Sequence, residues 1–228
     1  MDTTSNSSEL QPPRRKEAAA VTPQPPDPPR ARRTRIDFCR SWVYLNRKPF
    51  SFPQRPYLAA PYNCRARRMV IRASRQVEKT SLLVNTVIFW AIERPGTNII
   101  CVFPRHEQAQ VFSCTRLLAT ILDSPQIRRV LLGRGDRPPK IMNMEFANGS
   151  RVFVRAAFHT SDAARGIPGD LLLVDEFQDI SQGNLPVLEE CLSHSKLRGV
   201  ILTGTPKLAA NHLESTFCDS TANEWLVP

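Results

Sequence analysis

The sequence predicts an α/β fold in which a central, mainly parallel β-sheet is flanked by helices. Four apolar segments have the length and composition of buried strands, and stretches with helical spacing separate them. One apolar strand ends in the carboxylates Asp175 and Glu176, and another is followed by a polar turn and by Lys79-Thr80 at the start of a helix. Ligands of open α/β sheets bind beyond the carboxyl ends of the strands, so these two segments predict a site there.

Composition sets the size and charge of the molecule. The chain has 228 residues, of which 41% are hydrophobic, and a formal net charge of +10. This is enough for one α/β domain and a tail, and the positive charge suits a polyanionic partner. Residues 1–35 are rich in proline and arginine, so we expect a disordered basic tail before a folded domain at 36–228. Whether the tail touches DNA or a partner protein, or is a plain solvated extension, stays open.

The cysteines and the apolar runs bear on the cellular compartment. Six cysteines are scattered with no C-x-x-C pair, which argues against a zinc site and against a disulfide framework. A reducing intracellular compartment fits this pattern best. Residues 1–20 lack the apolar run of a signal peptide, and the apolar stretch at 82–92 is too short to span a bilayer. We therefore expect a protein that is neither secreted nor embedded in a membrane.

The segment at 52–58 contains the ingredients of a base-binding site. It joins an amide, Gln54, to the aromatic rings of Phe52 and Tyr57. A ring can stack on a purine, and an amide can read the edge of the base. The same residues equally suit a packing segment that caps the edge of the sheet. Both interpretations stay open, and in the first of them Gln54 binds adenine.

The first predicted strand is 68–73, and a polar turn follows it. Lys79 and Thr80 come after the turn and open an apolar helical run over 82–92. Strand, turn, Lys-Thr and helix form the layout of a phosphate-binding loop. In such a loop the first amides of the helix and the lysine bind phosphate, and the hydroxyl binds Mg²⁺.

This turn departs from the usual G-x-x-x-x-G-K-[ST] pattern. Ala73 and Glu78 stand at the two glycine positions. Glu78 places a carboxylate close to the expected phosphates. Arg75 is a second cation within the turn, and we expect it to offset the charge of Glu78.

The middle of the chain supplies the next elements. A buried strand is predicted at 98–103, closed by Pro104, and residues 105–122 have helical spacing. Asn148-Gly149 is a strong hairpin signal between the segments 140–146 and 150–156.

The last predicted elements surround the acidic pair. The buried strand at 171–174 ends in Asp175-Glu176, and a helix is expected near 185–192. A further apolar strand at 199–204 leads into Thr203-Gly204-Thr205, whose hydroxyls can sense a γ-phosphate at the sheet edge. Taken alone, the acids also fit a solvated strand end and the hydroxyls an ordinary exit into a turn. Three weak motifs in the correct order favour a P-loop nucleotide-binding sheet.

From about residue 50 to 228 the chain resembles the ATPase domain of the large terminase subunit, the DNA-packaging motor of tailed bacteriophages and related viruses. The loop of that family has the form Ser-Arg-Gln-x-Gly-Lys-[Ser/Thr], and the similar residues here are Ser74-Arg75-Gln76-Val77-Glu78-Lys79-Thr80. The likeness extends to further motifs: Asn148-Gly149-Ser150, Ala164-Arg165-Gly166, the strand 171–176, Thr203-Gly204-Thr205-Pro206, the segment around Gln54 and the closing residues 223–228.

The resemblance implies an ASCE-type P-loop NTPase fold with ATP and Mg²⁺ as cofactors. It places residues 74–80 and Asp175 around the nucleotide, with Lys79 and Arg75 on the phosphates and Thr80 and Asp175 on Mg²⁺. It gives Glu176 the attacking water, and it makes Thr203 and Thr205 reporters of hydrolysis. Arg165 is the candidate for an arginine finger that acts on the site of a neighbouring subunit. A contact to DNA phosphate or a salt bridge is the alternative role for Arg165.

The resemblance also implies a function and partners. ATP hydrolysis would power translocation of double-stranded viral DNA into a procapsid in the host cytoplasm. The portal protein, the small terminase subunit and a homo-oligomeric ring are the expected partners, and no membrane is involved. A metal-dependent nuclease domain follows the ATPase in that family; it is not expected here, and neither is DNA cutting. A helicase-like P-loop ATPase and a non-hydrolysing nucleotide- or DNA-binding module are the alternatives.

Overall fold

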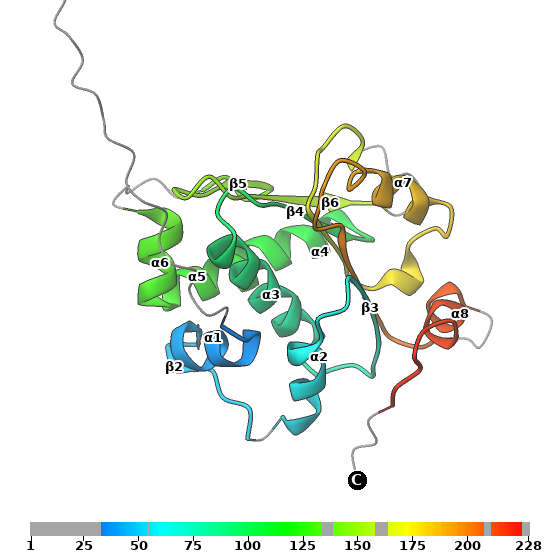
Figure 1. The fold of residues 1–228 in the computed structure, drawn as a ribbon, viewed down its shortest axis with the longest axis horizontal. Coiled ribbons are helices and arrows are strands. Elements are labelled where there is room, and N and C mark those ends of the chain that lie inside the picture. Colours follow the sequence, from blue (N-terminus) through cyan, green and yellow to red (C-terminus); the bar gives the residue numbers. More distant parts are fainter. Residues whose placement is uncertain (1–32, 54, 134–138, 158–163, 208–210, 225–228) are drawn as a thin grey trace, which may run out of the picture. The chain divides into compact units, whose positions relative to one another are not determined.

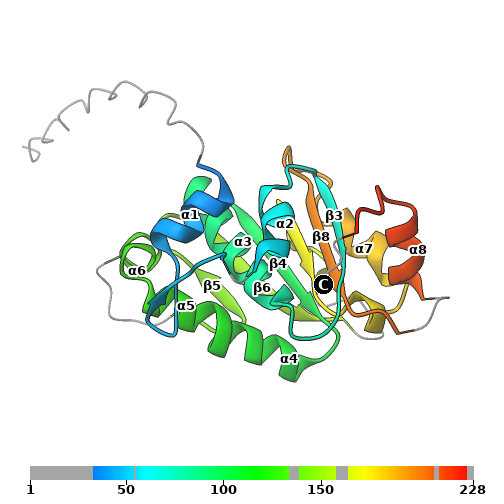
Figure 2. The same cartoon turned by 90° about the horizontal axis from the view of Figure 1, so that it is seen from below.

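The computed structural model describes residues 33–53, 55–133, 139–157, 164–207 and 211–224. These residues form a six-stranded sheet of order β3-β8-β7-β4-β6-β5 and a separate hairpin in which β1 pairs with β2. Helices cover both faces of the larger sheet (Figures 1 and 2). Most of the predicted tail, Gln54 and the closing residues 225–228 lie outside the described part of the chain.

The sheet is parallel except at one edge. Its parallel strands are β3 (Arg68–Arg72), β8 (Gly199–Gly204), β7 (Leu171–Val174), β4 (Asn98–Phe103) and β6 (Arg151–Ala156). The strand β5 (Asn143–Glu145) runs antiparallel to β6, and Asn148-Gly149 lies in the turn between them. The predicted α/β class, the mainly parallel sheet and the hairpin are confirmed.

The strand β3 differs from its prediction. The sequence suggested a core strand at 68–73, but β3 lies at the edge of the sheet and, within the described residues, pairs with β8 alone. Its first residue, Arg68, is exposed and the other four are only half-buried, whereas all four residues of β7 are buried. An edge strand has one neighbouring strand instead of two. Its apolar residues predict a strand, but they do not tell whether that strand lies at the edge or in the centre of the sheet.

The helices of one face start with α3 (Lys79–Glu93), which begins directly after the polar turn. The predicted helix at 105–122 is a continuous run of α4 (His106–Val111), a π-helical segment η2 (Phe112–Leu118) and α5 (Ala119–Asp123). The helix α6 (Pro125–Leu132) follows. Apolar spacing predicted the helical character of this run, but not its π-helical segment.

The beginning of the domain packs on the same face. It contains α1 (Arg35–Trp42), the hairpin strands β1 (Tyr44–Leu45) and β2 (Lys48–Pro49), a 3₁₀ turn η1 (Pro56–Leu58) and α2 (Ala59–Asn63). Arg35, which we expected in the tail, is buried in α1, and its guanidinium donates to the hydroxyl of Thr86 at 3.3 Å. The folded domain therefore begins before residue 36, because Thr34 caps α1 by accepting a hydrogen bond from the amide of Asp37.

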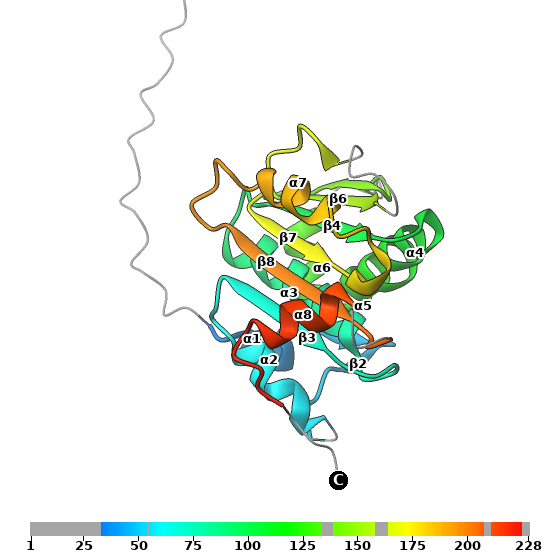
Figure 3. The ribbon, with the colours of Figure 1, turned by 90° about the vertical axis from the view of Figure 1, so that its right-hand side faces the viewer.

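The opposite face carries α7 (Asn184–Glu190) and α8 (His212–Cys218), which lie in front of the sheet in Figure 3. Two hydrophobic cores result, one on each side of the sheet. None of the helices in the described part of the chain has the length and hydrophobicity that crossing a membrane would need.

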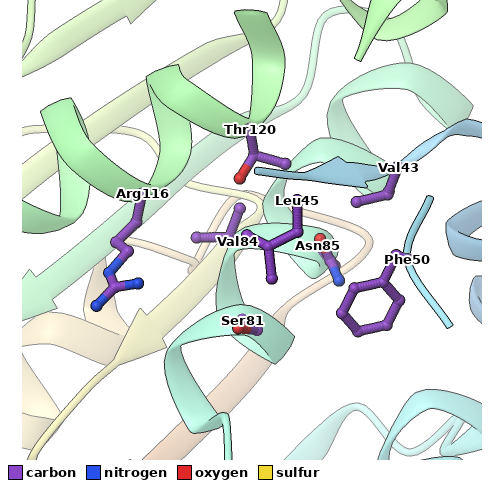
Figure 4. Close-up of a pocket in the computed structure, with 8 residues that line it drawn as sticks. All are labelled: Val43, Leu45, Phe50, Ser81, Val84, Asn85, Arg116 and Thr120. Atoms are coloured by element: carbon purple, nitrogen blue, oxygen red, sulfur yellow. The ribbon is translucent and has the colours of Figure 1, made fainter. Parts of the chain in front are cut away.

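A small cavity of about 20 Å³ lies between α3, η2, α5 and β1 (Figure 4). Its lining combines apolar side chains such as Val84 and Phe50 with the polar groups of Asn85 and Thr120. This volume holds about one water molecule and is too small for a substrate. The candidate site therefore lies elsewhere, at the carboxyl edge of the sheet.

Candidate nucleotide site

Strand pairing brings three predicted motifs to one place. The polar turn follows β3, the acidic pair follows β7, and Thr203-Gly204-Thr205 ends β8, which lies between those two strands. In the parallel ladders, Arg72 pairs with Gly204 and Val174 with Leu202. The three strand ends are therefore nearly level, and their loops meet at one edge.

The turn between β3 and α3 is built without glycine. Gln76 has φ +63° and Glu78 has φ +60°, so two ordinary residues adopt the left-handed conformation. This conformation costs a non-glycine residue roughly 1–2 kcal/mol. Glu78 directly precedes Lys79 in the backbone conformation that a glycine would adopt without strain. The turn thus keeps its bend although the glycine is missing.

Lys79 is the first residue of α3 and is only 8% exposed. Its ammonium group donates to three oxygen atoms: the carbonyls of Ala73 (3.2 Å) and Ser74 (2.8 Å) and the hydroxyl of Thr205 (2.9 Å). Burial lowers the pKa of Lys79, and the nearby carboxylates of Glu176 and Asp175 oppose this effect. The lysine therefore lies between the β3 turn and the β8 end, next to the acidic pair.

Asp175 is buried at the end of β7. One carboxylate oxygen, Oδ1, accepts from the hydroxyl of Thr203 at 2.7 Å and from the amide of Glu176 at 3.0 Å. The other, Oδ2, lies 3.5 Å from the hydroxyl of Thr80 on α3. Burial raises the pKa of Asp175, and the hydrogen bond from Thr203 opposes the rise.

A hydroxyl and a carboxylate are the hard oxygen ligands that Mg²⁺ prefers. Among the described residues, no group of three or more His, Cys, Asp or Glu side chains has the geometry of a metal site. Thr80 and Asp175 are the two oxygen-bearing side chains here that could hold such an ion.

Gln178, two positions after Glu176, is a site residue that the sequence analysis did not identify. Glu176 itself has φ +49°, and its carboxylate accepts a hydrogen bond from the side-chain amide of Gln178. The amide oxygen of Gln178 in turn accepts from the backbone amide of Thr205 at 3.0 Å. Gln178, which is 8% exposed, thus connects the acidic pair to the end of β8. Only its closeness to Glu176 in the sequence hinted at such a role.

Gly204 is needed for this connection. A Cβ atom at position 204 would lie 2.4 Å from Oε1 of Gln178 and 2.6 Å from a methyl group of Leu213. We expect Gly204→Ala to lower the free energy of unfolding by about 1–3 kcal/mol, because one of these neighbours must move. Thermal unfolding measures the loss. Gly183→Ala is the matched control, since nothing lies within 4 Å of its new Cβ; equal stability of the two variants would contradict the close approach.

Glu78 is paired with a residue outside its own turn. Its carboxylate forms an ion pair with the guanidinium of Arg55, whereas Arg75 lies exposed at the surface of the turn. Arg55 is therefore the ion-pair partner of Glu78, and a contribution of Arg75 to offsetting its charge stays a prediction. Arg55 is 23 positions away in the sequence, which is why local reasoning did not find it.

A cavity of about 950 Å³ runs along β3, beside the turn. Ser74, Val77 and Lys79 line it, as do Tyr57 from η1 and Phe217 from α8. Its size is sufficient for a nucleotide.

The two rings proposed for base binding differ in their positions. Phe52 is buried, and its ring packs against those of Phe50 and Tyr62 at 5.2 and 5.0 Å, so it belongs to the core. Tyr57 lines the cavity and can reach a ligand there. Gln54 lies outside the described residues.

The remaining candidates lie on exposed segments. Gln76 is exposed in the turn. Arg165 is exposed in a turn before β7. The next residue in this turn, Gly166, has φ +77°. The arginine-finger role of Arg165 stays a prediction.

The comparisons with known proteins bear on the family and the fold of the chain. A family model for the phage terminase large subunit gpA, ATPase domain, matches residues 46–228. The large terminase of bacteriophage HK97 superposes with a TM-score of 0.67 at 13% identity, over 82% of this chain and 40% of that one. An ATPase-domain mutant of the large terminase of Thermus phage P74-26 gives 0.56 at 22% identity, over 69% and 67% of the two chains.

A third solved structure is the large terminase of a thermophilic bacteriophage in complex with ADP. It gives a TM-score of 0.52 at 11% identity, over 68% of this chain and 37% of that one. At these identities the three likenesses show the fold. The chain spans less than half the length of the HK97 protein. A comparison with curated protein sequences found no match.

Proposed function

The chain belongs to the family of the phage terminase large subunit gpA ATPase domain, and we propose that it hydrolyses ATP to drive double-stranded viral DNA into a procapsid. One observation carries the proposal. Lys79, Asp175 and Thr205, from three separate strand ends, lie in one hydrogen-bonded group at the edge of the sheet, and Gln178 connects Glu176 to it. A cation, a metal-binding acid and a second acid in one place are the groups that phosphoryl transfer needs.

The polar turn and the start of α3 would bind the phosphates. The first amides of α3 point out of the helix and favour an anion. Lys79 adds a positive charge inside this turn, and the exposed Arg75 adds a second one at its surface. A large terminase of similar fold was solved in complex with ADP, which supports nucleotide binding by this chain.

Mg²⁺ would bind to the hydroxyl of Thr80 and to the carboxylate of Asp175. The ion neutralises phosphate charge when bound. Thr203 orients Asp175 through its 2.7 Å hydrogen bond. Tyr57 and Gln54 are the candidates for holding the adenine ring in the cavity beside β3.

Glu176 would orient the attacking water and accept its proton. Its carboxylate is only half-buried, and Gln178 holds it in place. Thr203 contacts Asp175, and Thr205 contacts Lys79, so the end of β8 touches both sides of the site. Loss of the γ-phosphate would change both contacts, and β8 would carry this change to the rest of the motor.

The partners belong to the same proposal. They are double-stranded DNA, a portal protein, a small terminase subunit and further copies of this chain in a ring, where Arg165 would reach into a neighbour's site. The place of action would be the procapsid in the host cytoplasm. The basic residues among positions 1–32, which precede the folded domain in the sequence, would add charge that suits DNA.

The test is ATP hydrolysis by the purified chain with and without double-stranded DNA. We expect Mg²⁺-dependent release of phosphate that DNA increases. Because glutamate replaces glycine at position 78, a module that binds nucleotide without hydrolysing it is the second candidate. MgATP binding with no phosphate release under either condition would support that candidate. Strand separation on forked DNA would point to a helicase instead.

A further inference from the structure

We propose that Arg55 determines the nucleotide affinity of the site by neutralising Glu78 within the phosphate-binding turn. This inference rests on the proposed nucleotide site and adds to it a residue that need not touch the nucleotide. The starting point is the position of Glu78, which stands directly before Lys79 at the start of α3. A carboxylate there adds negative charge where the helix and the lysine would attract phosphate.

Arg55 is held in place from several sides. Besides its ion pair with Glu78, its guanidinium donates to the carbonyl of Ser51 at 3.0 Å and lies over the ring of Phe50 at 5.6 Å. Phe50 is buried against Phe52 and Tyr62. The ring of Phe50 therefore connects the guanidinium of Arg55 to the hydrophobic core, and this contact restricts the side-chain conformations that Arg55 can adopt.

Glu78 is held less completely. One carboxylate oxygen accepts from Arg55, but the other, Oε2, is buried and has no hydrogen-bond partner within the described part of the chain. About a quarter of each of the two side chains, Arg55 and Glu78, is exposed.

Removal of Arg55 would leave Glu78 with an uncompensated charge beside the phosphates. The carboxylate would then repel the ligand, and the repulsion would increase with the number of phosphate charges. A purely structural role for Arg55 predicts equal losses for all nucleotides. The dependence on phosphate number therefore separates the two explanations.

The experiment is a double-mutant cycle in the full chain, with Kd values for MgATP, MgADP and AMP from isothermal titration calorimetry. The variants are Arg55→Ala, Glu78→Gln and the double variant. We expect Arg55→Ala to weaken MgATP by about tenfold, MgADP by less and AMP least, which corresponds to about 1.4 kcal/mol for MgATP. In the Glu78→Gln background the same change should alter every Kd by less than about twofold, because no charge is left to neutralise.

Controls separate this effect from damage to the fold. Arg40→Ala removes another guanidinium that lies over a ring of the same cluster, Phe52 at 5.6 Å, and should leave all three Kd values unchanged. Should Arg55→Ala unfold, Arg55→Gln keeps the side-chain length and removes the charge. Thermal unfolding of each variant identifies which one to use.

Two results would overturn the inference. Equal weakening by Arg55→Ala in the wild-type and Glu78→Gln backgrounds would mean that Arg55 acts on the nucleotide directly. An unchanged Kd for MgATP in Arg55→Ala would mean that the ion pair does not set affinity. Absence of MgATP binding by the wild-type chain is a different outcome, and it would overturn the proposed function itself.

Discussion

Replacing Glu176 with glutamine is expected to lower ATP turnover by roughly 10²–10⁴-fold, the usual contribution of a general base, while MgATP still binds. Glutamine has nearly the same shape and can still accept a hydrogen bond from Gln178, so the loop should keep its conformation. It cannot accept the proton of the attacking water. Steady-state phosphate release measures the loss, and calorimetry measures the retained affinity.

Glu145→Gln provides a matched control for that variant. Glu145 is an exposed carboxylate on β5, at the opposite edge of the sheet from β3, where it forms an ion pair with Arg151. The same change of chemistry there should leave turnover close to that of the wild type. Normal turnover in Glu176→Gln, or an equal loss in both variants, would remove Glu176 from its role.

Replacing Lys79 with alanine is expected to weaken MgATP binding by about 10- to 100-fold, the value of a charged hydrogen bond, and to reduce hydrolysis with it. The ammonium is a buried cation close to the acidic pair, and it also bonds to the turn and to Thr205. If Lys79 binds phosphate as proposed, its loss removes that contact together with a support of the turn. Calorimetry with MgATP and a phosphate-release assay measure the two effects.

Lys207→Ala is the control for Lys79→Ala. Lys207 is an exposed lysine paired with Asp179, outside the hydrogen-bonded group of the site. Its removal should leave the affinity for MgATP unchanged. A wild-type Kd in Lys79→Ala, with the fold shown intact by thermal unfolding, would mean that the turn does not bind phosphate.

Local patterns in the sequence were sufficient to predict most of the helices and strands of the fold. Apolar runs of strand length and helical spacing predicted β4, β7, β8 and α3, and Asn148-Gly149 predicted the hairpin of β5 and β6. The position of β3 at the edge was not predictable in this way, since strand order depends on contacts between distant segments. The same holds for the π-helical segment η2, which keeps the apolar spacing of an ordinary helix.

The candidate site was predicted from the order of the motifs along the chain more than from any single motif. Once β3, β7 and β8 are parallel neighbours, their carboxyl ends must meet, and Lys79, Asp175 and Thr205 come together. The Arg55–Glu78 pair and the bridge through Gln178 depend on side-chain directions and close packing at Gly204. No periodicity or motif in the sequence encodes those directions.

The order of the strands has one more consequence. Within the described residues, β8 lies between β3 and β7 and pairs with both of them. At its end, Thr203 bonds to Asp175 and Thr205 bonds to Lys79, so one strand contacts both the acidic and the cationic group of the site. A displacement of β8 would therefore alter the hydrogen bonds of Lys79 and of Asp175 at the same time.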